Sequence, residues 1–179
     1  MIFLKIFRAC HARKGVFVDS GANEGTWSLL AAAHGCTAVA IEPQPYCAAL
    51  LRAASERSGF NELIHLHNNA FVDNPKNATK LCVPLDMCRG TATYTNGQVT
   101  DIRSKDFSVP KGTHCVEVPF VTLDELVPPG SSVDLWHLDV EGAELVALRS
   151  ARKLLLERRI LRIMMEVDSM QRWRLHVRT

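Results

Sequence analysis

VFVDSGANEGTWSLL (residues 16–30), followed by AVAIEPQP (residues 38–45), decides the fold of this 179-residue chain. The first stretch predicts a short buried strand that ends at Asp19, a turn with two glycines, and a helix that begins at Thr26. The second stretch predicts another buried strand, which ends at Glu42. Two strands joined by a crossover helix form the unit from which parallel α/β sheets are built. We therefore expect such a sheet, with both acids at its carboxyl edge.

The acids and glycines of this unit predict an adenosine-binding site. Glu42 follows Gly21 by 21 residues, where an acceptor can take both hydroxyls of a ribose. Asp19 would repel a pyrophosphate, but it can pair with the ammonium of S-adenosylmethionine while loop amides near Gly25 bind the carboxylate. The spacing also differs from the Gly-x-Gly-x-x-Gly of nicotinamide enzymes. We therefore expect S-adenosylmethionine; the alternative is that the glycines only allow a tight connection and Asp19 caps the helix.

Composition indicates one domain over residues 1–179. The hydrophobic fraction of 47% is sufficient for a core between a sheet and its helices. The net charge of +2 is too small to predict nucleic-acid binding, although both termini are basic and could form amphipathic elements. No apolar run approaches the roughly 18 residues that span a bilayer.

The six cysteines include no Cys-x-x-Cys pair, and three lie in apolar stretches. We expect free thiols and therefore a reducing compartment, which favours the cytoplasm. Because the first 14 residues are basic and lack acids, import into a mitochondrion or another organelle is the alternative. The seven histidines, among them His65 and His67, show no zinc-ligand spacing, so no metal site is expected.

The remaining segments continue the alternation of strands and helices. Strands are predicted at Leu63–His67, Val133–Val140 and Ile160–Val167, and helices at Gln44–Ser58, Thr122–Val127 and Gly142–Arg158. Between residues 71 and 118 the helical period disappears, and turn signals separate short stretches with strand character, among them Thr91–Thr95 and Cys115–Val121. We therefore expect an α/β fold with a mainly parallel sheet, helices on both faces, and a β-rich insertion between strands three and four.

Six motifs occur in a fixed order: VFVDSGANEGTWSL, AIEPQP, NNAFVD, VTLDEL, LDVEGAEL and IMMEV. In this order they resemble the FkbM-type S-adenosylmethionine-dependent methyltransferases, and the resemblance covers a core of residues 16–167. It implies a Rossmann-like methyltransferase fold and O-methylation of a hydroxyl on a sugar or another small molecule. It also implies cofactor contacts at Asp19, Gly21, Asn23, Gly25 and Asp139, ribose binding by Glu42, an adenine-side position at Asn69 and Ala70, and a reaction centre near Asp139, Glu141 and Glu144.

The chain departs from this family in three places, one of which is LRSA (residues 148–151), where LRGA is usual. His137 stands where the family commonly has a lysine, two residues before the aspartate of LDVEG. The sequence also stops soon after the fifth strand, where methyltransferases of this fold have two further strands. We expect the terminal strands to be truncated, and the open sheet edge to attract a partner protein or a second copy of the chain.

Asp139, His137 and Glu141 are the expected catalytic residues. Side chains two apart on a strand share a face, so His137 and Asp139 should both reach the cofactor end of the sheet. A hydroxyl acceptor has to lose a proton, which His137 steered by Asp139 could accept. The structural alternative is a buried histidine, with Asp139 capping the next helix and Glu141 favoured by the positive end of that helix.

Two other classes of function remain open at this point. The first is a catalytically inactive, methyltransferase-like subunit that serves as a scaffold or binds an adenosine ligand, since a fold does not guarantee its chemistry. The second is a nucleic-acid methyltransferase, which only the basic termini favour. Binding of S-adenosylmethionine or its demethylated product distinguishes an enzyme from a scaffold without a cofactor.

Overall fold

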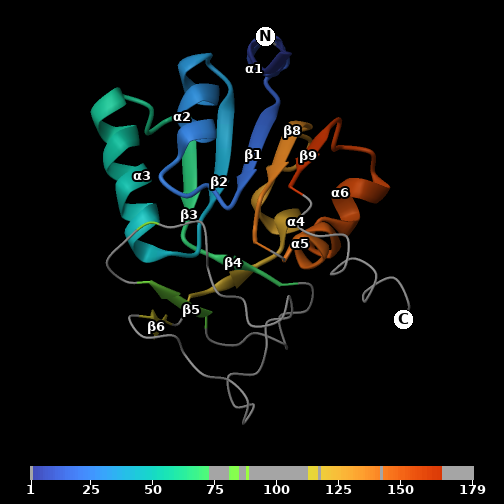
Figure 1. Ribbon diagram of the computed structural model, residues 1–179. Coiled ribbons are helices and arrows are strands. Elements are labelled where there is room, and N and C mark those ends of the chain that lie inside the picture. Colours follow the sequence, from blue (N-terminus) through green and yellow to red (C-terminus); the bar gives the residue numbers. More distant parts are fainter. Residues whose placement is uncertain are drawn as a thin grey trace.

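A parallel sheet forms the centre of the molecule (Figure 1). The computed structural model describes residues 2–72, 81–84, 88, 113–116, 118–141 and 143–166. Across the sheet the strands are β3 (Ile64–His67), β2 (Thr37–Ile41), β1 (Val16–Ser20), β8 (Val133–Leu138) and β9 (Ile163–Met165). Each neighbouring pair is parallel. The predicted Rossmann-like α/β sheet is therefore confirmed, and its direction of growth reverses between β1 and β8.

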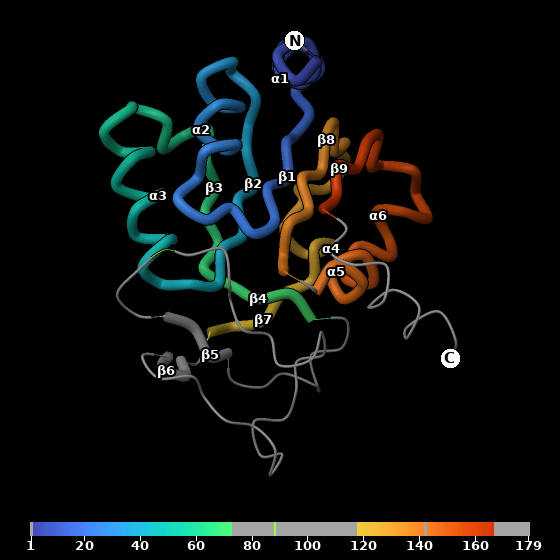
Figure 2. Tube along the Cα trace, in the orientation of Figure 1, coloured from blue at the N-terminus to red at the C-terminus, as the bar shows by residue number. Residues whose placement is uncertain are grey.

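Helices cover both faces of this sheet, as expected (Figures 1 and 2). One face carries α1 (Ile2–Arg13), α2 (Thr26–Ala33) and α3 (Pro45–Ser58), and the other carries α4 (Leu123–Leu126), α5 (Glu144–Ser150) and α6 (Arg152–Leu156). Phe17 packs with the first set, whereas Val16 and Val18 pack with the second, because successive side chains of a strand point to opposite faces. Within the described residues, no helix is both long and apolar enough to cross a membrane.

The insertion between the third and the next sheet strand is β-rich in its described parts. β4 (Ala70–Phe71) pairs in parallel with β7 (Phe120–Val121), and β5 (Leu81–Pro84) pairs antiparallel with β6 (Thr113–Val116). Figures 1 and 2 place β4 and β7 beyond the carboxyl ends of the central strands. The predicted strand Cys115–Val121 is divided between β6 and β7, and Thr91–Thr95 lies outside the described residues.

The helix predicted at Gly142–Arg158 is two shorter helices, α5 and α6, which meet at Ala151. Asp124 of α4 gives the physical reason. Its two carboxylate oxygens accept hydrogen bonds from the backbone amides of Lys153 (2.8 Å) and Leu154 (2.9 Å). A carboxylate at such otherwise unpaired amides stabilises the start of a helix. The break therefore depends on a contact between segments that are far apart in the sequence.

The expectation of free thiols is wrong for four cysteines. Cys10 of α1 is bonded to Cys36, which directly precedes β2, and Cys47 of α3 is bonded to Cys88. The Cα atoms of these pairs are 5.4 Å and 5.0 Å apart, within the range that a disulfide spans. Disulfides persist mainly in oxidising compartments. The two bonds therefore contradict the free thiols from which a reducing compartment was expected.

The basic amino-terminal stretch is an amphipathic element packed on the domain, one of the options that its sequence left open. Phe7 and Cys10 of α1 are fully buried, and the ring of Phe7 lies 5.2 Å from that of Phe17. At the end of the helix, the guanidinium of Arg13 pairs with the carboxylate of Asp134, which is fully buried in β8. A charge at that depth is tolerated because it is paired.

Candidate active site

The turn after β1 contains three residues in left-handed backbone conformations. The φ angle is 77° at Gly21, 54° at Asn23 and 92° at Gly25. A Cβ atom at Gly21 would lie 1.7 Å from the carbonyl oxygen of Asp139, and one at Gly25 would lie 2.1 Å from Cδ1 of Leu51. Glycine is therefore needed at both positions because of close packing within the protein as well as the φ angle. The turn brings the end of β1 directly against the residue that follows β8.

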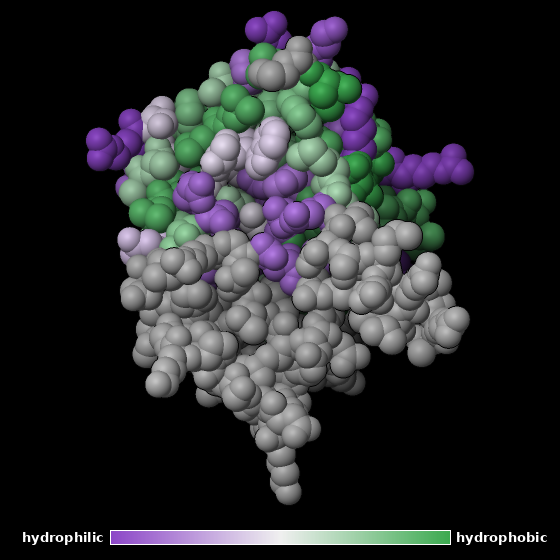
Figure 3. All heavy atoms as spheres, in the orientation of Figure 1, coloured by the Kyte–Doolittle hydropathy of each residue, from purple (hydrophilic) through white to green (hydrophobic). Residues whose placement is uncertain are grey.

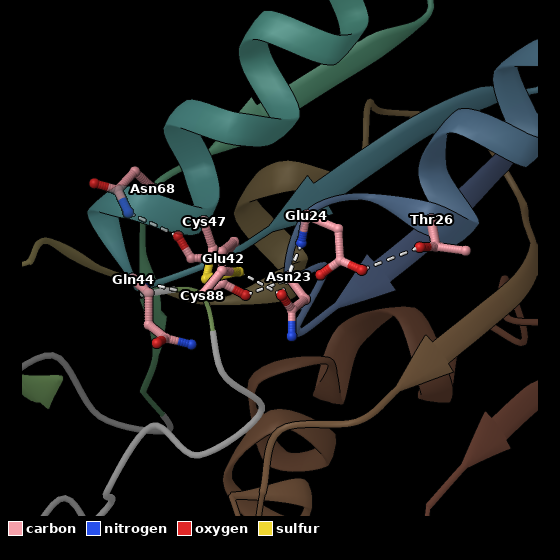
Figure 4. Close-up of a disulfide and its surroundings, with 8 residues drawn as sticks. All are labelled: Asn23, Glu24, Thr26, Glu42, Gln44, Cys47, Asn68 and Cys88. Carbon is pink, nitrogen blue, oxygen red and sulfur yellow. Dashed lines mark hydrogen bonds between the residues drawn. A yellow bond between two sulfur atoms is a disulfide. The ribbon is translucent and has the colours of Figure 1, made fainter. Parts of the chain in front are cut away.

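Glu42 lies at the end of β2, beside this turn (Figure 4). The residue is 2% exposed, and its two carboxylate oxygens accept hydrogen bonds of 2.8 Å from the backbone amides of Asn23 and Gln44. Burial raises the pKa of Glu42 to about 7, although these amides act in the opposite direction. A carboxylate has about four lone-pair positions, so the two amides leave capacity for further donors. Glu42 is thus an oriented acceptor that ionises near neutral pH.

Asn68 is a residue of this region that the sequence did not indicate. Its Nδ2 atom donates a hydrogen bond of 2.7 Å to the carbonyl oxygen of Glu42. The residues expected on the adenine side are placed differently, because Nδ2 of Asn69 donates to the carbonyl oxygen of Pro119 (3.1 Å) and Ala70 is 1% exposed within β4. Two adjacent asparagines look alike in a sequence. Only the path of the chain after β3 shows that Asn68 is the one that meets Glu42.

Asp19 is buried beneath the turn, with 1% of the residue exposed. Its Oδ2 atom accepts a hydrogen bond of 2.6 Å from the hydroxyl of Ser28, and its Oδ1 atom lies 2.9 Å from Nδ1 of His137. The expected partner of His137 was Asp139. The structure pairs His137 with Asp19 instead, because the register of β1 and β8 places these two residues side by side.

Trp27 packs against His137, the partner of Asp19. The ring of Trp27 lies 5.5 Å from that of His137, and the ring of Phe3 lies 4.9 Å from that of Trp27. As a result, 12% of the His137 side chain is exposed. Hydrogen bonds between polar groups are electrostatically stronger in such a shielded environment than in water.

Asp139 is the first residue after β8, and its backbone amide donates to the carbonyl oxygen of Ser20 (3.0 Å). Its Oδ1 atom is buried and has no hydrogen-bond partner among the residues that the structure describes. A buried carboxylate oxygen without a donor is costly. This atom therefore marks a position where a hydrogen-bond donor of a ligand would fit.

The other acids of the expected reaction centre follow Asp139 along the chain. Glu141 has a left-handed backbone with a φ angle of 54°, and Glu144 is 7% exposed in the first turn of α5. The ends of β1, β2 and β8 are thus followed by the glycine turn, Glu42 and the acidic loop, all at the carboxyl edge of the sheet. Figure 3 shows hydrophilic residues gathered at the centre of the face that it draws. In the described part of the chain, no group of three histidines, cysteines or acids is arranged to hold a metal ion.

A parallel sheet that reverses at β1 and β8, with a glycine turn after β1 and an acid after β2, is the arrangement of a Rossmann-like α/β protein. Residues 19–177 match the profile of the Methyltransferase FkbM domain, and the chain belongs to this family. The resemblance that the six motifs indicated is thereby confirmed. S-adenosylmethionine is accordingly the cofactor that the site has to accommodate.

Solved structures similar to this chain include an RNA methyltransferase from Salinibacter ruber in complex with S-adenosyl-L-homocysteine. The two chains are 20% identical with a TM-score of 0.32, over 38% of this chain and 46% of the other. The match therefore spans less than half of that enzyme. No curated protein matches the chain.

Proposed function

We propose that this protein transfers a methyl group from S-adenosylmethionine to a hydroxyl oxygen of a sugar or another small molecule. The observation that carries the proposal is the pair of buried acids at the carboxyl edge of the sheet. Glu42 retains acceptor capacity beside the glycine turn, and Oδ1 of Asp139 has no donor among the residues that the structure describes. Membership of the FkbM methyltransferase family supports the same class of reaction.

The residues at this edge fit the chemistry of the cofactor. Glu42 would accept hydrogen bonds from the ribose hydroxyls. The backbone amides from Gly21 to Gly25 already donate within the protein, so the methionine carboxylate would bind to other donors. Asp139 is suited to a cationic or hydroxyl donor, because its buried oxygen is negatively charged when the acid is ionised. When bound, S-adenosylmethionine supplies an electrophilic methyl group on its sulfonium.

Asp139 has a second role in this proposal, as the group that receives the proton of the acceptor hydroxyl. Removal of that proton makes the oxygen nucleophilic as its bond to the methyl carbon forms. His137 is held by Asp19 and covered by Trp27, so its ring has a fixed orientation close to the same strand end. Glu141 belongs to the same loop and would line the acceptor side. Positioning and exclusion of water would supply much of the rate enhancement.

The test combines cofactor binding with turnover. We expect S-adenosylmethionine and S-adenosylhomocysteine to bind the oxidised chain in isothermal titration, and methyl transfer to occur with members of a panel of hydroxyl compounds. Lack of binding by either ligand would refute the proposal. Binding without turnover on sugars, small alcohols or RNA would favour the inactive scaffold, and turnover on RNA alone would identify a nucleic-acid methyltransferase.

A single substitution tests the role of the ribose acceptor. Glu42→Ala should weaken S-adenosylhomocysteine binding by about 1–3 kcal/mol, the range for a hydrogen bond to a charged group. Glu62→Ala is the matched control, because Glu62 is exposed on the loop before β3. Equal affinities of the two folded variants would remove Glu42 from the site.

We also propose that the chain works in an oxidising compartment and not in the cytoplasm that its sequence favoured. The two disulfides support this location. Mass spectrometry of the protein isolated from its native cell without reductant, after blocking of free thiols, provides the test. If Cys10, Cys36, Cys47 and Cys88 of the isolated protein are found as blocked thiols, the protein works in a reducing compartment.

A further inference from the structure

The disulfide between Cys47 and Cys88 lies at the candidate cofactor site. Cys47 is fully buried in the first turn of α3, three residues after Gln44. Cys88 belongs to the insertion, and its Sγ atom contacts Oδ1 of Asn23 in the turn after β1. Figure 4 shows the two sulfur atoms beside Glu42, between α3 and that turn. One covalent link therefore joins the insertion to the immediate surroundings of the ribose acceptor.

The two ends of this disulfide meet the two segments that orient Glu42. The backbone amide of Asn23 binds one carboxylate oxygen of Glu42, and the backbone amide of Gln44 binds the other. Cys88 contacts the first of these residues, and Cys47 is part of the helix that the second one precedes. The disulfide thus connects both sides of the carboxylate. Asn23 has a left-handed backbone with a φ angle of 54°, a conformation that asparagine adopts more readily than most other residues.

We propose that the Cys47–Cys88 disulfide is a positioning element of the cofactor site: it holds the turn at Asn23 and the start of α3 in the arrangement that directs Glu42 toward the ribose. This inference rests on the proposed function, since it assumes that Glu42 binds the cofactor. The two cysteines touch no reacting atom in this assignment. They act through Asn23 and Gln44 and so determine how well the ribose is recognised.

The second disulfide provides a control within the same molecule. Cys10 and Cys36 are both fully buried, and they join α1 to the start of β2, whereas Glu42 follows the other end of that strand. Loss of either disulfide removes a constraint on the unfolded chain. The two closures are of similar length, with sequence separations of 26 and 41. Only the Cys47–Cys88 bond contacts the turn that orients Glu42. If the two variants differ in ligand binding, the difference therefore arises from where the disulfide lies and not from lost stability alone.

The experiment compares the oxidised wild type with Cys47→Ser/Cys88→Ser and Cys10→Ser/Cys36→Ser by isothermal titration with S-adenosylhomocysteine. We expect the first variant to bind at least tenfold more weakly and the second to stay within about twofold of the wild type. A second measurement is the ratio of the association constants of adenosine and 2′-deoxyadenosine. This ratio should fall toward one only in Cys47→Ser/Cys88→Ser. If the wild type does not bind S-adenosylhomocysteine, the proposed function fails. If it binds and the two variants match it, only the positioning role fails.

Reduction of the wild-type protein tests the inference and does not depend on whether a substituted protein folds. If the disulfide supports ligand binding, the ligand must favour the disulfide by the same factor, because coupling between two equilibria is reciprocal. In a redox buffer, saturating S-adenosylhomocysteine should shift the equilibrium of Cys47–Cys88 toward the disulfide by at least tenfold and leave Cys10–Cys36 unchanged. Differential alkylation, followed by mass spectrometry of peptides cut with trypsin and chymotrypsin, measures the oxidised fraction of each cysteine pair. An unchanged Cys47–Cys88 equilibrium, or free Cys47 and Cys88 in the untreated protein, would overturn the inference.

Discussion

At the scale of single residues, Glu42 and Asp19 show how two similarly buried carboxylates differ in their hydrogen-bond partners. Asp19 belongs to β1 and Glu42 follows the neighbouring strand β2, and both are almost fully buried. Asp19 is satisfied by the side chains of Ser28 and His137, whereas Glu42 is held by two backbone amides. Asp19 is thus linked to side chains of α2 and β8, whereas Glu42 is oriented by the backbone on both sides of the strand end.

The raised pKa of Glu42 predicts a pH-dependent stability in the absence of ligand. Between pH 4.5, the ordinary value, and about 7, the value in the folded protein, the folded state retains a proton that the unfolded chain has released. The free energy of unfolding should therefore decrease as pH rises through this window and level off above it.

Glu42→Gln removes this contribution, because glutamine does not titrate. Relative to the wild type, the variant should gain stability on the order of 3 kcal/mol between pH 4.5 and 8. Urea denaturation of both proteins at several pH values measures the difference. A difference that does not change with pH would show that Glu42 does not ionise in this window.

Asp19→Asn should lower the free energy of unfolding by about 1–3 kcal/mol, because it weakens two buried hydrogen bonds, to Ser28 and His137. Glu24→Gln is the matched control, since Glu24 lies in the same turn but is exposed. Thermal and urea denaturation provide the comparison. If the two variants were equally stable and only Asp19→Asn lost cofactor affinity, the charge of Asp19 would serve the ligand and not the fold.

At the scale of elements, close contacts between the turns that follow the strands fix the positions of the strand ends. The turn after β1 packs against the backbone of Asp139 after β8, and the start of α2 packs against Leu51 of α3. These approaches leave no room for side chains at Gly21 and Gly25. The site is thus formed by contacts between turns whose strands are not consecutive in the sequence.

Gly21→Ala and Gly59→Ala separate the cost of crowding from that of backbone conformation. Both glycines have left-handed φ angles, 77° and 69°, but a Cβ at Gly59 would meet nothing within 4 Å. We expect Gly59→Ala to cost about 1 kcal/mol, from the conformation alone. Gly21→Ala should cost clearly more and also reduce S-adenosylhomocysteine binding, because backbone atoms of Asp139 have to move. Equal losses of stability in urea denaturation would contradict the close approach.

At the scale of the whole molecule, the described part of the domain is held together by the five-stranded sheet, the apolar cores on its two faces and the disulfides Cys10–Cys36 and Cys47–Cys88. The disulfide at Cys10 attaches α1, which precedes the family match at residues 19–177, to the start of β2. β9 is an edge of the described sheet, and Ile163 is 41% exposed there. Association of a partner or a second copy at that edge stays a prediction.

Removal of the Cys10–Cys36 disulfide should destabilise the domain by about 2–5 kcal/mol, through the added freedom of the unfolded chain. Cys10→Ser/Cys36→Ser in urea denaturation without reductant measures the loss. Addition of reductant to the wild type should produce at least as large a loss, because it opens both disulfides. A variant as stable as the wild type would show that non-covalent contacts, among them the packing of Phe7 and the pair of Arg13 with Asp134, are sufficient to hold α1 in place.

Local patterns in the sequence determined the strands, the glycine turn and the family. The apolar runs at Val16–Val18 and Ala38–Ile41 form strands because both faces of the sheet are buried. Thr122 was predicted to begin a short helix, and its amide indeed bonds to Glu125 in a capping box at the start of α4. Such features depend on neighbours within a few residues, which a sequence shows directly.

The tertiary structure alone decided which distant groups meet. The pairing of His137 with Asp19 follows from strand register, and the break at Ala151 follows from the carboxylate of Asp124. The bond between Cys47 and Cys88 likewise joins segments whose proximity depends on the completed fold. These contacts depend on how separate elements pack against one another, and no spacing within a single stretch of sequence encodes that arrangement.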